Sequence, residues 1–134
     1  MKKNLLFALP GLMVMLFSAS CSKSDTTPAT SYTIVGKWDG SYVGAGGPSH
    51  FYTLNFKTGG SFAVDSSNVS ITDLAAGTWV LATDSVRATY TYLSGGAGTY
   101  SLAGKYSADF KTMIGTFGPG SNTTGSGTFS VTKN

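Results

Sequence analysis

Residues 86–106 read VRATYTYLSGGAGTYSLAGKY, and this stretch decides the fold class. On both sides of its glycine-rich centre, apolar or aromatic side chains alternate with polar ones. Alternation with a period of two is typical of a β-strand that buries one face. The short join at residues 94–97 suits a hairpin between neighbouring strands. The stretch therefore predicts two adjacent antiparallel strands.

The same alternation recurs through the rest of residues 32–134, for example in the apolar pair Trp79 and Leu81. Thr, Tyr, Phe and Val favour strands, and no window places apolar residues at helical spacing over three turns. Residues 67–76 fit the pattern less well, and Val69-Ser70-Ile71 is either a short extra strand or a helical turn. The expected strands cover residues 33–43, 49–58, 61–66, 77–83, 86–93, 98–107, 111–118 and 126–133.

About eight short antiparallel strands that follow one another in the chain form a meander. As an open sheet the meander would expose two edges, and closure into an up-and-down barrel removes both. A barrel of about eight strands encloses packed side chains or one small ligand. We therefore predict an all-β, up-and-down barrel over residues 32–134. A two-sheet β-sandwich is the alternative.

The segment at residues 1–20 has the layout of a secretory signal peptide. A basic start precedes an apolar run at residues 5–17, which is shorter than the roughly 20 residues of a membrane-spanning helix. Small residues then lead to Cys21, the single cysteine of the chain. This order resembles the signal peptide of bacterial lipoproteins, although Ser18 stands where that family usually has Leu. The resemblance implies lipidation of Cys21, and an ordinary signal peptide that contains a cysteine is the alternative.

The residues that follow the cysteine are polar and lack large apolar side chains, so they cannot bury enough surface to fold. We expect residues 21–31 to be the lipidated cysteine and a flexible tether. In gram-negative lipoproteins, an Asp directly after the cysteine favours retention in the inner membrane, and here that residue is Ser22. The resemblance therefore implies a lipid anchor in the outer membrane, with the domain on the periplasmic or the cell-surface side.

The charge of the chain does not favour nucleic-acid binding. The formal net charge is +3, and it becomes +1 when Lys2 and Lys3 leave with the signal peptide. A nearly neutral domain lacks the basic surface that attracts phosphate groups. The remaining chain has the length of one domain with one core, and we expect a monomer.

Residues that would carry catalysis or hold a metal ion do not form a recognisable pattern. His50 is the single histidine, follows a glycine-rich loop and has no catalytic partner in the sequence. Zinc and calcium motifs are also missing from the sequence. The sequence therefore predicts neither an enzyme nor a cofactor. Most aspartates fall at expected turns; the full set is Asp25, Asp39, Asp65, Asp73, Asp84 and Asp109.

Tyrosine is the residue type with a positive functional indication. A buried phenol needs a hydrogen-bond partner, and many phenols are difficult to satisfy in a small dry core. We therefore expect some of them to line the open end of the barrel. Alternation along a strand places every second side chain on the inward face of the barrel, and we say that such residues have inward parity. The tyrosines that have inward parity, like Trp38 and Trp79, are Tyr42, Tyr52, Tyr90, Tyr92, Tyr100 and Tyr106.

The predicted ligand site is the open end of the barrel, near Tyr42, His50 and Tyr52, with Tyr90 and Tyr92 on a strand across the barrel. It would bind a small hydrophobic or aromatic molecule. In the alternative, the phenols only reach water at the rims and the core is filled. The lipoprotein would then be structural, and would bind a protein or glycan through its loops.

A Gly-Thr-aromatic motif recurs in the predicted strands. The glycine allows a sharp bend, and the aromatic residue two positions later fills space on the same face. The relative Gly36-Lys37-Trp38 lies on the first strand. The repeats stand at residues 77–79, 98–100, 115–117 and 127–129.

These motifs resemble the calycin group of barrels. Gly36-x-Trp38 resembles the lipocalin signature, and the Gly-Thr-aromatic repeats resemble strands of avidin-type proteins. The resemblance covers residues 34–134 and implies a short lipocalin-like barrel whose closed end is plugged by Trp38. No residues match the biotin site of avidins, so no such site is transferred to this chain.

Overall fold

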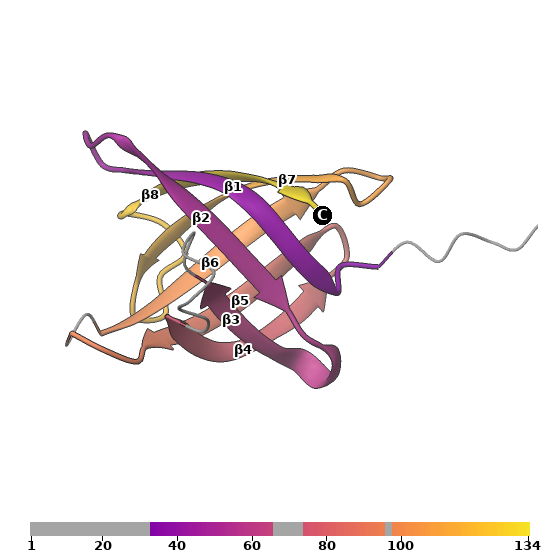
Figure 1. The fold of residues 1–134 in the computed structure, drawn as a ribbon, viewed down its shortest axis with the longest axis horizontal. Coiled ribbons are helices and arrows are strands. Elements are labelled where there is room, and N and C mark those ends of the chain that lie inside the picture. The colour runs from indigo at the N-terminus through magenta and orange to yellow at the C-terminus, as the bar shows by residue number, and fades with distance from the viewer. Residues whose placement is uncertain (1–32, 66–73, 96–97) are drawn as a thin grey trace, which may run out of the picture. The chain divides into compact units, whose positions relative to one another are not determined.

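The structure, a computed structural model, describes residues 33–65, 74–95 and 98–134. These residues form a closed barrel of eight antiparallel strands in sequence order, in which the last strand pairs with the first (Figure 1). The predicted up-and-down barrel is confirmed, and the sandwich alternative is wrong. The strands are β1 (Gly36–Gly44), β2 (Ser49–Phe56), β3 (Ser61–Asp65), β4 (Ala75–Ala82), β5 (Ser85–Tyr92), β6 (Thr99–Tyr106), β7 (Thr112–Pro119) and β8 (Gly127–Lys133).

The observed strand bounds lie close to the predicted ones. A single 3₁₀ turn, η1 (Thr58–Gly60), joins β2 to β3. The largest differences are at the start of β1, which begins at Gly36, at the end of β2, which is Phe56, and at the start of β4, which begins at Ala75. The last residues of the uncertain segment 67–76 are therefore strand. Val69-Ser70-Ile71 lies outside the described residues.

Side chains with the predicted inward parity fill the barrel. The strand register explains why these side chains contact one another, because paired residues on neighbouring strands point to the same face of the sheet. Trp38, for instance, pairs with Leu54 of β2, and both are fully buried. The other large buried residues inside the strands are Tyr52, Phe56, Phe62, Val64, Val86, Tyr90, Leu102, Met113, Phe129 and Val131.

Trp38 plugs one end of the barrel, as the lipocalin resemblance implies. Its indole Nε1 donates a hydrogen bond to the backbone oxygen of Ile34 at 2.9 Å, which satisfies the polar atom of an otherwise apolar ring. The ring of Phe56 meets the indole edge-on, with centroids 6.4 Å apart. The ammonium of Lys133 lies 5.7 Å from the centroid of the indole. We call this the closed end.

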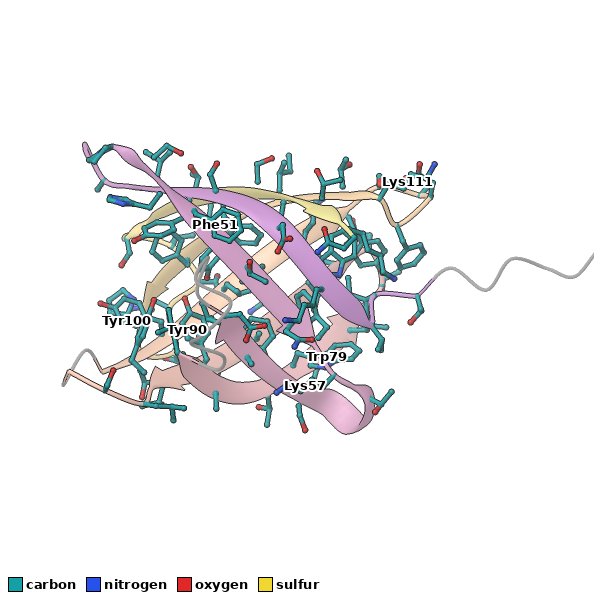
Figure 2. The ribbon with its side chains drawn as sticks, viewed as in Figure 1. Phe51, Lys57, Trp79, Tyr90, Tyr100 and Lys111 are labelled. Carbon is teal, nitrogen blue, oxygen red and sulfur yellow. The ribbon has the colours of Figure 1, made fainter. Side chains whose placement is uncertain are left out.

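The apolar pair Trp79 and Leu81 on β4 does not enter the core as a pair. Trp79 is partly buried, and its Nε1 donates to the backbone oxygen of Lys57 at 2.9 Å (Figure 2). Leu81 is 54% exposed. The pairing of β3 with β4 reaches only to Thr78, so the end of β4 runs past its neighbour. No adjacent strand on that side shields Leu81 from water.

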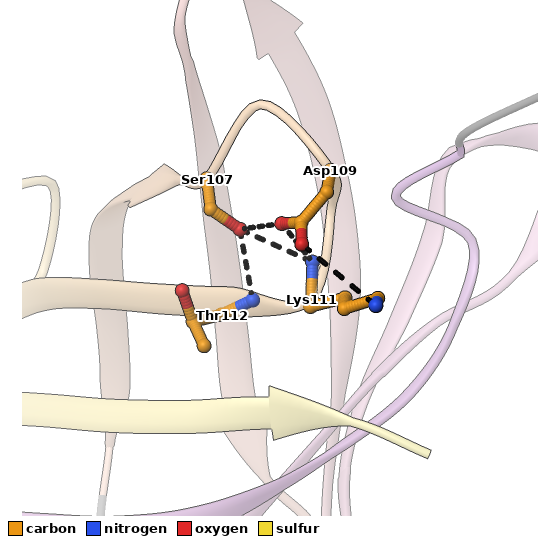
Figure 3. Close-up of polar contacts among 4 residues, drawn as sticks. All are labelled: Ser107, Asp109, Lys111 and Thr112. Carbon is orange, nitrogen blue, oxygen red and sulfur yellow. Dashed lines mark hydrogen bonds and ion pairs between the residues drawn. The ribbon is translucent and has the colours of Figure 1, made fainter.

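The β6–β7 turn at the closed end is held by its own polar side chains (Figure 3). The Ser107 hydroxyl donates to the Asp109 carboxylate at 2.6 Å and accepts the backbone N–H of Thr112 at 3.0 Å. The hydrogen bond from Ser107 is the main cause that lowers the pKa of Asp109. Phe110 adopts a φ of 54°, and its ring stacks on that of Tyr106 with centroids 4.6 Å apart. The turn therefore adds an aromatic cover beside the plug.

Glycines of the recurring Gly-Thr-aromatic motif have two structural roles: some allow a close approach of the neighbouring strand, and one allows a turn. A Cβ at Gly77 would overlap the backbone oxygen of Thr89, and one at Gly115 would overlap the backbone oxygen of Ala103. At these positions the backbone of the neighbouring strand lies too close for any side chain. The sharp bend expected from the motif stays a prediction. Gly98 differs, because it has a φ of +75° and open space around it. It belongs to the β5–β6 turn.

Candidate ligand site at the open end of the barrel

A cavity of about 280 Å³ lies at the end of the barrel opposite Trp38. The β1–β2, β5–β6 and β7–β8 connections surround this open end (Figure 1). Figure 2 shows Tyr90 and Tyr100 at this end, and Trp79 and Lys57 towards the closed one. The described residues that line the cavity are Tyr42, Gly44, Tyr52, Tyr90, Tyr92, Tyr100, Phe117 and Ser126.

The structure brings four of the five predicted site residues together: Tyr42, Tyr52, Tyr90 and Tyr92 all line the cavity. The fifth, His50, does not line it. His50 is exposed at the start of β2, and its ring stacks on Tyr42 with centroids 5.2 Å apart and an angle of 25°. Since His50 pairs with Tyr42 in the register of β1 and β2, it lies on the same face as Tyr42 and stacks on it at the exposed rim of the barrel. Contact between these residues and a ligand stays a prediction.

Two aromatic residues of the cavity were not predicted at this site. Tyr100 lies directly opposite Tyr90 in the β5–β6 register, and their centroids are 6.2 Å apart. That register follows from the hairpin, so the signal was present in the sequence. Phe117 belongs to a Gly-Thr-aromatic repeat, but its position near Tyr42 depends on β7 and β1 both pairing with β8. Tyr106, which shares the inward parity, lies at the closed end instead.

The six rings that line the cavity form two groups of rings in contact with one another. Tyr42, Tyr52 and Phe117 make one group, with centroids between 5.2 and 6.5 Å apart. The other group has centroids between 5.8 and 6.2 Å apart, and consists of Tyr90, Tyr92 and Tyr100. Distances in this range are typical of favourable aromatic pairs. The described lining of the cavity is therefore largely aromatic.

A hydrogen bond joins the two groups. The phenol oxygens of Tyr52 and Tyr90 are 3.1 Å apart, and both side chains are buried. Burial is the main cause that raises the pKa of Tyr52 well above its ordinary value, and burial also raises the pKa of Tyr90 and of Tyr92. Electrostatic repulsion from neighbouring phenols raises these pKa values further, while the hydrogen bond with Tyr52 lowers that of Tyr90. The three phenols therefore stay protonated to a higher pH than exposed phenols, and keep both donor and acceptor capacity.

The described residues that line the cavity carry no formal charge. A larger hollow, of about 670 Å³, lies on the outside of β5–β8 against residues such as Arg87, Lys105 and Ile114. Its lining residues mostly have outward parity, and it has no comparable set of converging rings. The cavity at the open end therefore has the more specific construction of the two.

Neither a protein-family model, nor a curated protein, nor a solved structure matches the chain. The likeness to lipocalins thus rests on the eight-stranded closed barrel and on the short motifs that it contains.

In the described part of the chain, no group of three or more His, Cys, Asp or Glu residues is placed to hold a metal ion. Over the same residues, no helix has the length and apolar character needed to cross a membrane. Cys21 lies outside the described residues, so its lipidation stays a prediction.

Proposed function

We propose that this protein is a lipid-anchored, lipocalin-like barrel that binds a small organic ligand with a largely apolar surface at its open end. The observation that carries the proposal is that six aromatic rings line one cavity, whose described lining residues carry no charge. Small-molecule sites are typically concave, mostly apolar and equipped with a few polar groups, and the phenols supply such groups.

The volume of the cavity limits the size of the ligand. At about 280 Å³ it lies just below the roughly 300–1,000 Å³ of common ligand pockets. It is larger than the cavity of about 150 Å³ that accommodates benzene. A ligand group of one ring, or of similar bulk, fits these limits.

The proposed anchor comes from the N-terminal sequence. Cys21 would carry the lipid, and residues 22–31 would link it to the barrel at the outer membrane. Each buried methylene of an acyl chain contributes about 0.8 kcal/mol, so several chains together hold a protein on the membrane. Replacement of Cys21 by Ser should abolish incorporation of radiolabelled fatty acid. Unchanged incorporation in the Cys21→Ser protein would refute the anchor.

Ligand binding is tested with the chain from residue 21 onward, which contains the whole barrel, carrying Cys21→Ser so that it stays soluble. A panel of small hydrophobic and aromatic molecules is screened by thermal shift, because a ligand of the native state raises the melting temperature. Gly44 has inward parity, and a Cβ there meets only the Ser126 backbone oxygen at 3.8 Å. Gly44→Phe should therefore fill the cavity and abolish the shift.

Val43→Phe is the matched control, because Val43 is the neighbouring residue and points outward with 39% of its surface exposed. It should leave the shift unchanged. Equal effects of the two substitutions on every ligand would contradict binding in the cavity.

A structural lipoprotein that binds a protein or glycan is the second candidate. The closed half of the barrel is filled, and Phe51, Val80 and Ile114 are exposed on the outer face. Scattered exposed apolar residues are common on soluble domains, so they carry less weight than the cavity. The absence of a thermal shift from every ligand class would favour this candidate.

A further inference from the structure

The aromatic box at the open end, formed by Tyr42, Tyr52, Tyr90, Tyr92, Tyr100 and Phe117, has a shape and a charge distribution that specify its ligand. We infer that it binds a methylated ammonium group, such as the trimethylammonium head of a choline-like molecule. This inference rests on the proposed function, and it narrows the ligand to a cation with an apolar surface.

The rings of the aromatic box leave no space for a flat ring between neighbouring aromatic side chains. Tyr42 stands at 87° to Phe117 with centroids 5.7 Å apart, and Tyr92 stands at 90° to Tyr100 with centroids 5.8 Å apart, so the rings of each pair touch edge to face. Tyr90 and Tyr100 are nearly parallel, but their centroids are only 6.2 Å apart. A ring stacked between two others needs about 7 Å between their centroids, which is twice the contact distance of carbon atoms. A ligand group therefore lies in the cavity of about 280 Å³ that the rings line, which has room for a compact head group of about the bulk of benzene.

The electrostatics of the aromatic box favour a positive charge. Each aromatic face is the negative side of the ring quadrupole, so a cavity lined by aromatic rings attracts a cation. The phenols of Tyr52, Tyr90 and Tyr92 are neutral around pH 7, as ordinary phenols are, and their oxygens offer lone pairs. No lysine, arginine or histidine is among the described residues that line the cavity. Nothing described in the lining therefore opposes a bound cation.

The residues that line the cavity favour a methylated ammonium group over a primary one. A primary ammonium has three N–H groups and is strongly hydrated, so its burial requires several strong acceptors. The described lining residues include no carboxylate. A quaternary ammonium has no N–H group, spreads its charge over methyl surfaces and is the ligand that aromatic cages bind.

The experiment compares choline with 3,3-dimethylbutan-1-ol, which replaces the nitrogen by carbon and so keeps the shape without the charge. Affinities are measured by calorimetry on the Cys21→Ser chain from residue 21 onward. We expect choline to bind about tenfold more tightly than the neutral alcohol. Equal affinities, or binding of the alcohol alone, would overturn the inference that the site prefers a cation. Either result would leave the proposed function intact. Failure of both probes and of the whole apolar panel would overturn both.

Variants of Tyr92 separate the effect of the ring face from that of fold and volume. Tyr92→Phe keeps an aromatic face and should retain choline affinity within about twofold, whereas Tyr92→Leu should weaken choline about fivefold. The affinity for the neutral alcohol should change less. An equal loss for both probes in Tyr92→Leu would count against a cation–π site. If Tyr92→Leu does not fold, Tyr42→Leu applies the same comparison to the other group of rings.

Discussion

At the scale of single residues, the indole of Trp38 contributes most to the closed end. It is fully buried and hydrogen-bonded to Ile34, and it packs against Phe56. We expect Trp38→Ala to lower the free energy of unfolding by about 3–5 kcal/mol, because the substitution leaves a cavity that neighbours cannot fill. Chemical denaturation measures this change. Val80→Ala, at a side chain that is 62% exposed, is the control and should cost less than about 0.5 kcal/mol. A Trp38→Ala protein as stable as this control would show that Trp38 is not a core residue.

The buried phenols predict how stability changes at alkaline pH. Burial raises the pKa of Tyr52 and of Tyr90 in the folded protein, while the unfolded chain titrates near pH 10. A raised folded-state pKa gives stability that is complete below pH 10 and is lost as pH rises above it. The melting temperature should therefore fall more steeply between about pH 9 and pH 11 in the parent than in the double variant Tyr52→Phe/Tyr90→Phe. The same slope in both proteins would contradict the burial of these phenols.

At the scale of strands and turns, alternation in the sequence predicted the inward faces because the side-chain period of a strand is two. It could not predict the exposure of Leu81, since parity does not reveal that β4 continues past Ser61, the first residue of the neighbouring strand β3. It also could not separate Gly98 from the other motif glycines. Gly98 shares their sequence context, but its positive φ belongs to a turn. The local sequence pattern therefore determines which face of a strand a side chain lies on. The pairing of neighbouring strands determines whether that side chain is buried.

The glycines that allow close strand crossing give a prediction at this scale. A Cβ at Gly77 would overlap the backbone oxygen of Thr89, so the strands must move apart to accept it. We expect Gly77→Ala to lower the free energy of unfolding by about 1–3 kcal/mol, as overpacking does. The control is Gly47→Ala, where the nearest atom to the added Cβ is 3.7 Å away. Urea denaturation of the two variants tests the difference, and equal stabilities would refute the role of Gly77 in the strand crossing.

At the scale of the whole molecule, the barrel determines which predicted site residues meet. Tyr42, Tyr52, Tyr90 and Tyr92 were grouped from parity and from their position near one end, and the structure places them around one cavity. His50 shares that parity but stands at the start of β2, where its exposed ring stacks on Tyr42 and does not line the cavity. Phe117 could not be assigned from local sequence, because closure of β8 onto β1 brings it to Tyr42.

The central claim is that the cavity at the open end binds a ligand. The most direct test is an NMR titration that follows the aromatic ring signals of the Cys21→Ser chain as choline is added. The account predicts saturable shifts in the rings that surround the cavity, with the rings of Trp38 and Phe56 at the closed end unaffected. Shifts confined to the outer face near Arg87 and Ile114, or the absence of saturable shifts with choline and with every apolar ligand of the panel, would contradict it.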